Sequence, residues 1–306
     1  MSRRNLPASV RQRLLDQAHS QDRPFQELLQ YYCMERFLYR LSRSQYANRF
    51  ILKGALLLTA WRAPLSRPTM DIDLMGRTSN ELAHIESIAR EVCAIEPEAD
   101  GVQFVPDSIK VTRIKEDAEY EGVRIRFQAM LAGAQVPMQI DIGFGDVIIP
   151  QPTTVEYPTL LDFPAPVLMA YPKETVIAEK LEAMTTLGLL NSRLKDYFDL
   201  WLLSRLYEFE GSTLRDSISA TFRHRETSIE ALPVGLTDAF GSDPAREKQW
   251  AAFLRRSRFK TAPTNLNDTV RAVREFAHPP LLAAASGSSF TVIWKPNTSW
   301  GMRHGN

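Results

Sequence analysis

The sequence predicts an α/β core that is preceded by helices and followed by an α-helical domain. Apolar and polar residues alternate along 123–130 and 136–142, as they do on half-buried strands. Prolines recur between Pro150 and Pro166, which is typical of a connection between domains. From about Lys173 onward the apolar residues follow a helical period. We therefore expect helices and core at 1–165, a helical domain at 166–280 and a partly flexible tail at 281–306.

The composition is that of a globular protein and argues against several other classes. The net charge is +1, so the overall charge does not indicate a nucleic-acid partner. No apolar run is long enough to span a bilayer, and the first residues lack the apolar stretch of a signal peptide. Cys33 and Cys93 match no metal or redox spacing. These observations predict a cytoplasmic protein that does not contact membranes.

The order of elements follows from capping residues, glycines and apolar periods. Ser9 is expected to cap the first helix and Pro24 to open the second. A short strand should end at Gly54, where a buried helix begins. A turn is expected at Gly133. The remaining expectations are strands at 70–74 and 102–114, and helices at 80–93 (capped by Ser79), 173–189, 194–207, 244–254 and 267–276, with a broken stretch before Gly235.

Asp71 and Asp73 are the most informative residues of the chain. On a strand they project from one face, where two like charges repel unless a cation lies between them. Asp141 follows the same alternation, and a neighbouring strand would bring it to the pair. Three carboxylates suit two Mg²⁺ ions about 3.5–4 Å apart. The alternative is a solvated polar face; Asp146 is either a turn residue or a substitute third carboxylate.

Gly54 is a candidate phosphate-binding residue. A glycine lets a phosphate approach the backbone, and a helix N-terminus offers free N–H groups and a favourable dipole. The simpler interpretation is a turn glycine. Lys53 either contacts phosphate or is a surface residue at the end of its strand.

Five ordered segments resemble the motifs of AbiEii-type nucleotidyltransferase toxins, which belong to the DNA polymerase beta-like nucleotidyltransferase superfamily. The resemblance implies a Mg²⁺-dependent toxin of a type IV toxin–antitoxin or phage-defence pair. Such a toxin transfers a nucleoside monophosphate from an NTP to an acceptor, with tRNA 3′ ends as acceptor in some relatives. The usual partner is a winged-helix antitoxin encoded nearby. The segments are Leu52-Lys53-Gly54-Ala55, Asp71-Ile72-Asp73, Gln139-Ile140-Asp141, Glu179-Lys180-Leu181-Glu182-Ala183 and Lys195-Asp196-Tyr197-Phe198-Asp199-Leu200.

The resemblance also implies roles for single residues. Many relatives carry glycine or serine at the position of Ala55, and alanine leaves phosphate binding to backbone groups. The implied metal ligands are Asp71, Asp73 and Asp141; the implied catalytic set adds Lys180, Asp196 and Asp199; the implied nucleotide-binding residues are Lys53, Gly54, Ala55, Lys180 and Lys195.

Lys180 lies on a largely apolar helix face, where a lysine needs a partner or a reason to be present. It either extends to solvent or holds its cation against the triphosphate. Asp196 and Asp199 could orient Lys180 or Arg193, or assist the acceptor hydroxyl. A local salt bridge would explain the spacing of Lys195 and Asp199.

Two groups of arginines and lysines remain open to two interpretations. Arg124 and Arg126 could neutralise the carboxylates or contact phosphate. The basic run Arg255, Arg256, Arg258 and Lys260 is either a solvated face or an RNA-backbone contact.

Three other functions are compatible with the same residues. A non-catalytic regulator could bind nucleotide or RNA on this fold, a metal-dependent nuclease could use the same acids without an NTP, and a related enzyme could nucleotidylate a small molecule.

Overall fold

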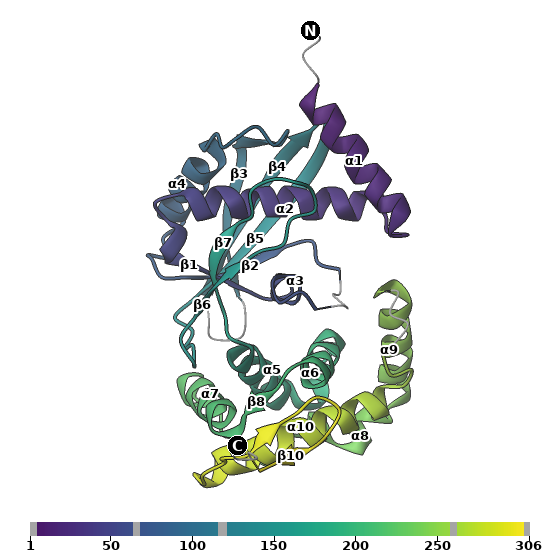
Figure 1. Ribbon diagram of the computed structural model, residues 1–306. Helices are drawn as coiled ribbons and strands as arrows, with labels where there is room; N and C mark the ends of the chain where they lie inside the picture. Colours follow the sequence, from purple (N-terminus) through teal and green to yellow (C-terminus); the bar gives the residue numbers. More distant parts are fainter. Residues whose placement is uncertain (1–4, 64–67, 116–120, 258–261, 303–306) are drawn as a thin grey trace. The chain divides into compact units, whose positions relative to one another are not determined.

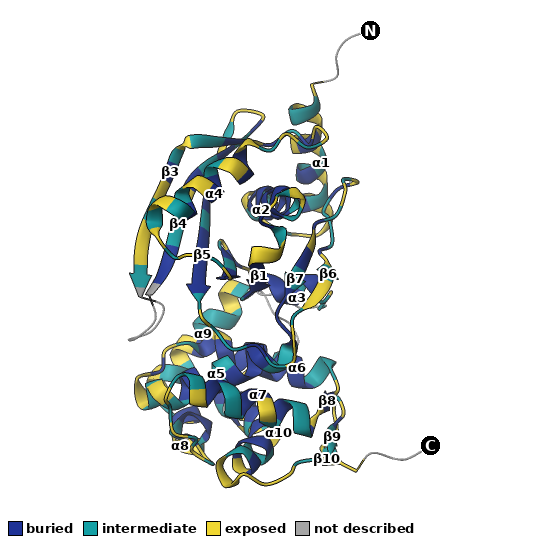
Figure 2. Ribbon diagram, turned by 90° about the vertical axis from the view of Figure 1, so that its left-hand side faces the viewer, coloured by how far each residue is buried: buried dark blue, intermediate teal, exposed yellow. Residues whose placement is uncertain are grey.

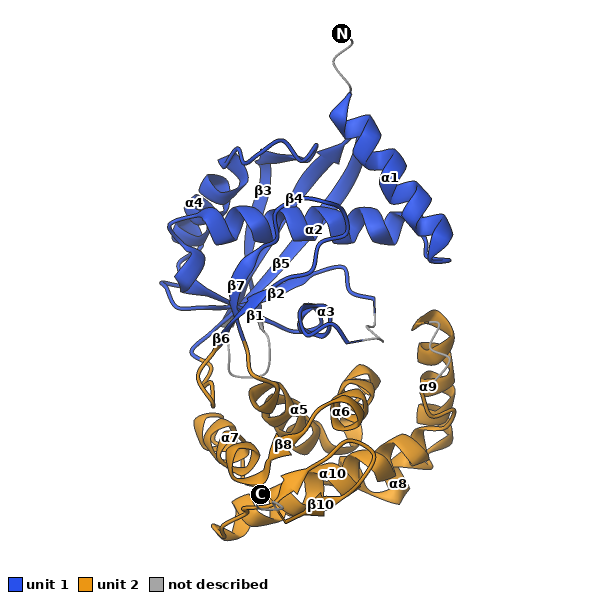
Figure 3. Ribbon diagram, viewed as in Figure 1, with its two compact units in different colours: residues 1–145, 153–170 blue, residues 146–152, 171–306 orange. Residues whose placement is uncertain are grey.

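The computed structural model describes residues 5–63, 68–115, 121–257 and 262–302, which form two compact units (Figure 3). Unit 1 comprises 1–145 and 153–170, and unit 2 comprises 146–152 and 171–306. The chain therefore passes between the units three times, at 145, 152 and 170. This differs from the single boundary at 165/166 that the prolines predict, because 167–170 form a strand of the unit 1 sheet.

Unit 1 is built on a mixed sheet, so the α/β prediction is confirmed (Figure 1). Within the described part of the chain this sheet has seven strands in the order β3-β4-β5-β2-β1-β7-β6. β2 runs parallel to β5 and antiparallel to β1, which places two distant segments side by side at its centre. The strands are β1 (Phe50–Lys53), β2 (Ile72–Gly76), β3 (Gln103–Lys115), β4 (Glu121–Leu131), β5 (Ala134–Phe144), β6 (Thr153–Glu156) and β7 (Val167–Ala170).

The register of the β4–β5 hairpin is set by a two-residue turn. Ala132 and Gly133 both have positive φ, +48° and +81°, as a type I′ turn requires. Leu131 then pairs with Ala134, and the ladder runs back from there. Because side chains alternate between faces, this register decides which polar residues meet.

Helices cover one face of the sheet (Figures 1 and 2). α1 (Leu6–Ser20) packs on α2 (Phe25–Arg43), and α2 and α4 (Leu82–Ala94) pack on the strands. α3 (Leu56–Ala60) follows β1. Asn5, not Ser9, caps α1, because the helix begins earlier than its apolar stripe. The N-cap of α4 is Glu81, and its backbone N–H donates a hydrogen bond to the Ser79 hydroxyl.

Unit 2 is mostly helical but departs from the expected element list in two places. The stretch before Gly235 contains a full helix, α7, in which Leu214, Ile218 and Phe222 are buried. α10 continues past Pro279 and Pro280 because its later turns are buried too. The elements are α5 (Lys173–Leu187), η2 (Gly188–Leu190), α6 (Leu194–Leu206), β8 (Phe209–Glu210), α7 (Gly211–His224), η3 (Val234–Leu236), α8 (Asp238–Gly241), α9 (Pro244–Ser257), α10 (Leu266–Ser286), β9 (Ile293–Trp294) and β10 (Trp300–Gly301).

The segment expected to be a tail is part of unit 2 as far as residue 302. β9 pairs with β8 and with β10, and the Trp294 ring is buried against Phe276. In the part of the chain that the structure describes, no helix has the length and apolar character needed to cross a membrane.

Candidate metal and nucleotide site

Four charged side chains form a row across the centre of the unit 1 sheet. Lys53 is the cross-strand partner of Asp73, Asp73 of Asp141, and Asp141 of Arg124. Cross-strand partners share a face and lie close together. The two carboxylates are thus side by side, with a cation on either side of them. This arrangement offsets part of the repulsion that two adjacent aspartates cause.

Asp71, which directly precedes β2, completes an acidic triad. Each of Asp71, Asp73 and Asp141 offers a carboxylate oxygen within 4.8 Å of the other two. Thr69 donates its hydroxyl to Asp71 Oδ1 at 2.6 Å, which fixes that carboxylate. Three hard oxygen donors at this spacing fit Mg²⁺ better than a soft metal. The structure brings the three predicted ligands together; their role in metal binding remains a prediction.

Arg124 binds the third carboxylate of the triad through both of its oxygens. Its Nε and Nη2 donate to Asp141 at 2.7 and 2.6 Å, and these hydrogen bonds raise the pKa of Arg124. Arg126, the next outward residue of β4, donates instead to Gln139 at 3.1 Å. Of the two arginines, only Arg124 neutralises the acids. Each carboxylate oxygen has a second lone pair, so Asp141 can keep these hydrogen bonds and still offer an oxygen to a cation.

Gly54 lies against Asp73, which the sequence did not predict. A Cβ atom at position 54 would meet Asp73 Oδ2 at 1.9 Å, and φ of Gly54 is +72°. Glycine is needed here so that the Asp73 carboxylate can occupy this position. Lys53 is 8% exposed, so the interpretation as a surface residue is wrong. Ala55 is the N-cap of α3, and that helix spans five residues, so its dipole is small.

Replacing Gly54 with Ala is expected to lower the rate of the nucleotidyl transfer that the motifs imply by about 10²-fold. A displacement of about 1 Å at a reacting centre has effects of this size. The new methyl group must push Asp73 away from the triad. Gly133→Ala is the matched control, since φ there is +81° but no atom lies within 4 Å of the added Cβ. Gly133→Ala should lose about 1–2 kcal/mol of stability from the strained backbone, and Gly54→Ala should lose more because its methyl group also displaces Asp73. Equal activity of the two purified variants would contradict the proposed contact.

In unit 2, Lys180 is bound by both of the acids that the sequence singled out. Lys180 Nζ lies 2.5 Å from Asp196 Oδ1 and 3.0 Å from Asp199 Oδ2. All three side chains are at most 15% exposed. The two acids therefore orient Lys180, one of the roles expected for them. Lys195 is exposed on α6, and its role and that of Lys180 in nucleotide binding remain predictions.

Replacing Lys180 with Met is expected to destabilise unit 2 by about 3–5 kcal/mol, because it leaves two neighbouring carboxylates buried without their cation. The exposed Lys195 gives a matched control: Lys195→Met should change the free energy of unfolding by less than about 0.5 kcal/mol. Urea unfolding of the two variants, followed by tryptophan fluorescence, compares them. Equal midpoints would show that the ion triad does not support the fold.

Arg225 was missed by the sequence interpretation and is the centre of a second charged cluster in unit 2. Its Nη1 donates to Glu182 at 2.8 Å, and its Nη2 lies 3.8 Å from Asp146 and 4.0 Å from Glu179. Burial acts to lower the pKa of Arg225, but Glu179 and Glu182 outweigh it and raise the pKa. Asp146 also accepts from the Tyr171 hydroxyl. Asp146 thus belongs to unit 2 and does not replace Asp141 in the triad.

Part of the basic run on α9 can be placed. Arg255 and Arg256 are exposed at the end of this helix, while Arg258 and Lys260 lie outside the described residues.

Comparisons with known proteins agree with the resemblance seen in the motifs. A model of the family described as nucleotidyl transferase AbiEii toxin, type IV toxin–antitoxin system, matches residues 36–277. No curated protein matches the chain. Two crystal structures are similar at 16% identity: an H. pylori protein assigned as a nucleotidyltransferase (86% of this chain, 96% of that one, TM-score 0.45) and JHP933 from Helicobacter pylori (86% and 93%, TM-score 0.44). Because the family model covers more than half of the sequence, the chain belongs to the AbiEii nucleotidyl transferase toxin family of type IV toxin–antitoxin systems.

Proposed function

We propose that this protein transfers a nucleoside monophosphate from an NTP to an RNA hydroxyl and that it requires Mg²⁺. The observation that carries the proposal is the acidic triad, whose oxygens lie within 4.8 Å of one another in a chain of a nucleotidyltransferase family. Asp71, Asp73 and Asp141 would hold the metal. Bound Mg²⁺ would neutralise phosphate charge and lower the pKa of the attacking hydroxyl.

The reaction is an in-line displacement at the α-phosphorus. A bond forms between the RNA oxygen and the α-phosphorus, and the bond to the bridging oxygen of pyrophosphate breaks. Pyrophosphate leaves with the electron pair, and the hydroxyl proton passes to water. Gly54 leaves room for Asp73, and Arg124 holds Asp141 in position. Positioning and charge neutralisation supply most of the rate in such transfers.

The acceptor and the partner follow from the family and not from the geometry. We propose a tRNA 3′ end as the acceptor, and a separately encoded winged-helix antitoxin as the partner of this type IV toxin. A role in phage defence belongs to the same proposal.

Incubation with Mg²⁺, total RNA and each α-labelled NTP in turn tests the proposal. We expect label in RNA with one or more NTPs, and none after chelation of the metal. A denaturing gel resolves which RNA is labelled and whether it is lengthened. Absence of label from every RNA, with folded protein, would refute transfer to RNA.

The same incubation, together with a binding measurement, separates the three rival functions. Shortened RNA without any need for NTP would indicate a nuclease. Label in a low-molecular-weight product would indicate a small-molecule nucleotidyltransferase. Binding of NTP or RNA without any labelled product would indicate a regulator.

A further inference from the structure

A cavity of about 520 Å³ adjoins the acidic triad in unit 1. Asp71 belongs to both, so a molecule in the cavity lies next to the proposed metal site. The volume falls in the range of about 300–1,000 Å³ that is usual for ligand sites. The described lining comes from β3, β4, β5 and the two residues that precede β2.

The cavity lies over a second cross-strand row that runs from acidic to basic. Gln139 is the partner of Arg126, and Arg126 is the partner of Lys110. Asp71 precedes Ile72, which pairs with Ile140, so Asp71 stands beside Gln139. Arg126 and Lys110 are both exposed. A ligand here meets a carboxylate at one end and two cations at the other.

An irregularity in β3 forms one side of the cavity. The β3–β4 ladder is interrupted so that Pro106–Ile109 lie opposite Phe127 alone. Ser108 fixes this bulge: its hydroxyl donates to Val105 O at 2.6 Å and accepts from Gln128 N at 2.8 Å. Bulges of this kind re-aim side chains near functional sites.

The opposite side is fixed by one buried amide. The side chain of Gln30, fully buried on α2, donates to Met70 O at 3.3 Å and to Pro137 O at 3.0 Å. Both carbonyls belong to residues that line the cavity. The hollow is therefore held open by polar contacts on two sides.

The topology of the sheet indicates which substrate enters this cavity. Gly54 directly follows β1, which lies on one side of β2 in the sheet. The cavity lies over β5, β4 and β3, on the other side of β2. In an in-line displacement the attacking and leaving oxygens lie on opposite sides of the phosphorus. With the leaving pyrophosphate toward Gly54, the acceptor approaches from the cavity. This step rests on the proposed function.

We propose that the cavity binds the 3′-terminal nucleotide of a single-stranded RNA acceptor. Lys110 and Arg126 bind its phosphodiester, because cations supply most of the affinity for nucleic-acid backbones. The amides of Gln128 and Gln139 both donate and accept hydrogen bonds, as recognition of a base edge requires. Met70, 53% exposed, offers an apolar surface for the base.

The test compares Arg126→Ala and Lys110→Ala with Arg113→Ala, an exposed arginine further along β3 that is not part of the cavity lining. The KM for RNA should rise about tenfold in the first two variants and stay unchanged in the third. The KM for NTP should stay within about twofold in all three. Arg126→Lys should restore part of the lost affinity, because it keeps the charge.

A binding measurement without NTP makes the outcome independent of catalysis. Fluorescence anisotropy with a short single-stranded RNA should show weaker binding by both variants, and the slope of log K against log salt should fall by about 0.7 for each lost contact. The same RNA closed into a circle should lose the effect of both substitutions, because it has no 3′ end.

Other results would overturn either the cavity assignment or the proposed function. A raised KM for NTP alone would place the nucleotide donor in the cavity. Unchanged RNA binding and KM, in an enzyme that labels RNA, would exclude the acceptor from it. If wild-type protein labels no RNA, the proposed function fails, and the anisotropy comparison still decides whether the cavity holds an RNA end.

Discussion

Replacing Asp73 with Asn should reduce nucleotidyl transfer by at least about 10³-fold, because roughly 4 kcal/mol of charge stabilisation in the transition state depends on this carboxylate. Asp73 lies between the other predicted parts of the site. Asp141 is its cross-strand partner, and Gly54 leaves the space for its carboxylate. Asparagine keeps the shape and removes the charge. The measurement is the initial rate of label transfer to RNA at saturating Mg²⁺ and NTP.

The fold should tolerate this change, which separates a functional carboxylate from a structural one. Loss of the repulsion from Asp141 offsets the loss of attraction to Lys53, so the free energy of unfolding should change by less than about 1 kcal/mol. Asp107→Asn is the matched control, since the Asp107 side chain is fully exposed on β3. Transfer at the wild-type rate by folded Asp73→Asn would end the claim that the triad is catalytic.

The strands and the candidate ligands could be predicted because they depend on local patterns. Alternation along 123–130 and 136–142 identified β4 and β5, and the same alternation predicted that Asp141 lies on the face opposite to Ile140 and Ile142. The pairing of Asp141 with Arg124 was within reach too. Once Ala132 and Gly133 are taken as a two-residue turn, the hairpin register places these two residues opposite each other.

Contacts that depend on distant segments could not be predicted. The partner of Asp73 on β1 and the approach of Gly54 follow from strand order, which no local pattern encodes. Arg225 was missed because α7 was missed. The helix starts with Gly-Ser-Thr, and residues of low helix propensity obscured the apolar spacing of Leu214, Ile218 and Phe222.

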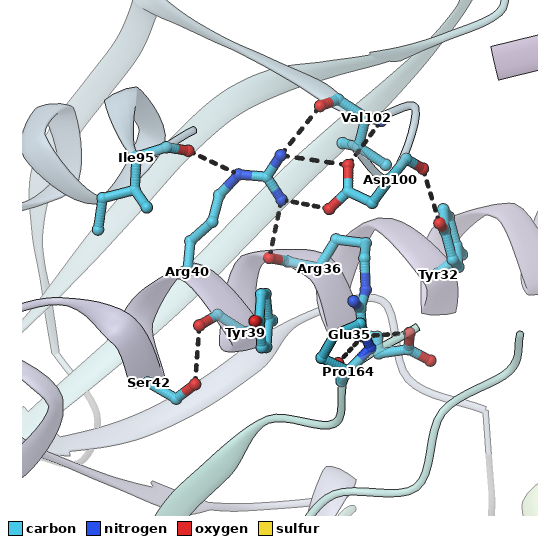
Figure 4. Close-up of polar contacts among 10 residues, drawn as sticks. All are labelled: Tyr32, Glu35, Arg36, Tyr39, Arg40, Ser42, Ile95, Asp100, Val102 and Pro164. Carbon is cyan, nitrogen blue, oxygen red and sulfur yellow. Dashed lines mark hydrogen bonds and ion pairs between the residues drawn. The ribbon is translucent and has the colours of Figure 1, made fainter. Parts of the chain in front are cut away.

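The helix α2 carries buried charges that the sequence interpretation did not consider (Figure 4). Arg40, 4% exposed, donates to both oxygens of Asp100 and to the carbonyls of Arg36, Ile95 and Val102. Asp100, 2% exposed, also accepts from the Val102 N–H. One guanidinium thus satisfies a carboxylate and three carbonyl groups where no solvent can do so.

One turn earlier, the neighbouring pair Glu35 and Arg36 is buried as deeply. Arg36 Nη2 lies 2.7 Å from Glu35, and Glu35 accepts from the Leu160 N–H. Burial nevertheless raises the pKa of Glu35 to about 7. The folded state then binds a proton that the unfolded state has released, so this group weakens the fold as pH rises from about 4.5 to 7. Comparisons of α2 variants are therefore best made at one pH above this range.

Replacing Arg40 with Met should destabilise unit 1 by about 3–5 kcal/mol. The substitution leaves the buried Asp100 carboxylate without its cation and three carbonyl groups without their donor. That loss is a large fraction of the roughly 5–15 kcal/mol that keeps a typical protein folded. Urea denaturation at pH 8 gives the free energy of unfolding, and Arg43→Met, an exposed arginine in the last turn of the same helix, is the matched control.

The double variant Arg40→Met/Asp100→Asn distinguishes a lost charge pair from lost packing. Asparagine at position 100 removes the unpaired negative charge but can still accept from the Val102 N–H. The double variant should therefore recover part of the stability lost in Arg40→Met. No recovery would assign the loss to packing or to the carbonyl groups. An Arg40→Met variant as stable as Arg43→Met would show that this network does not hold α2 to the chain around Asp100.

Since α2 also carries Gln30, which fixes the wall of the cavity, the proposed RNA site depends on the same helix. A destabilised α2 should therefore weaken RNA binding at urea concentrations that leave the protein folded, while Arg43→Met binds as the wild type does.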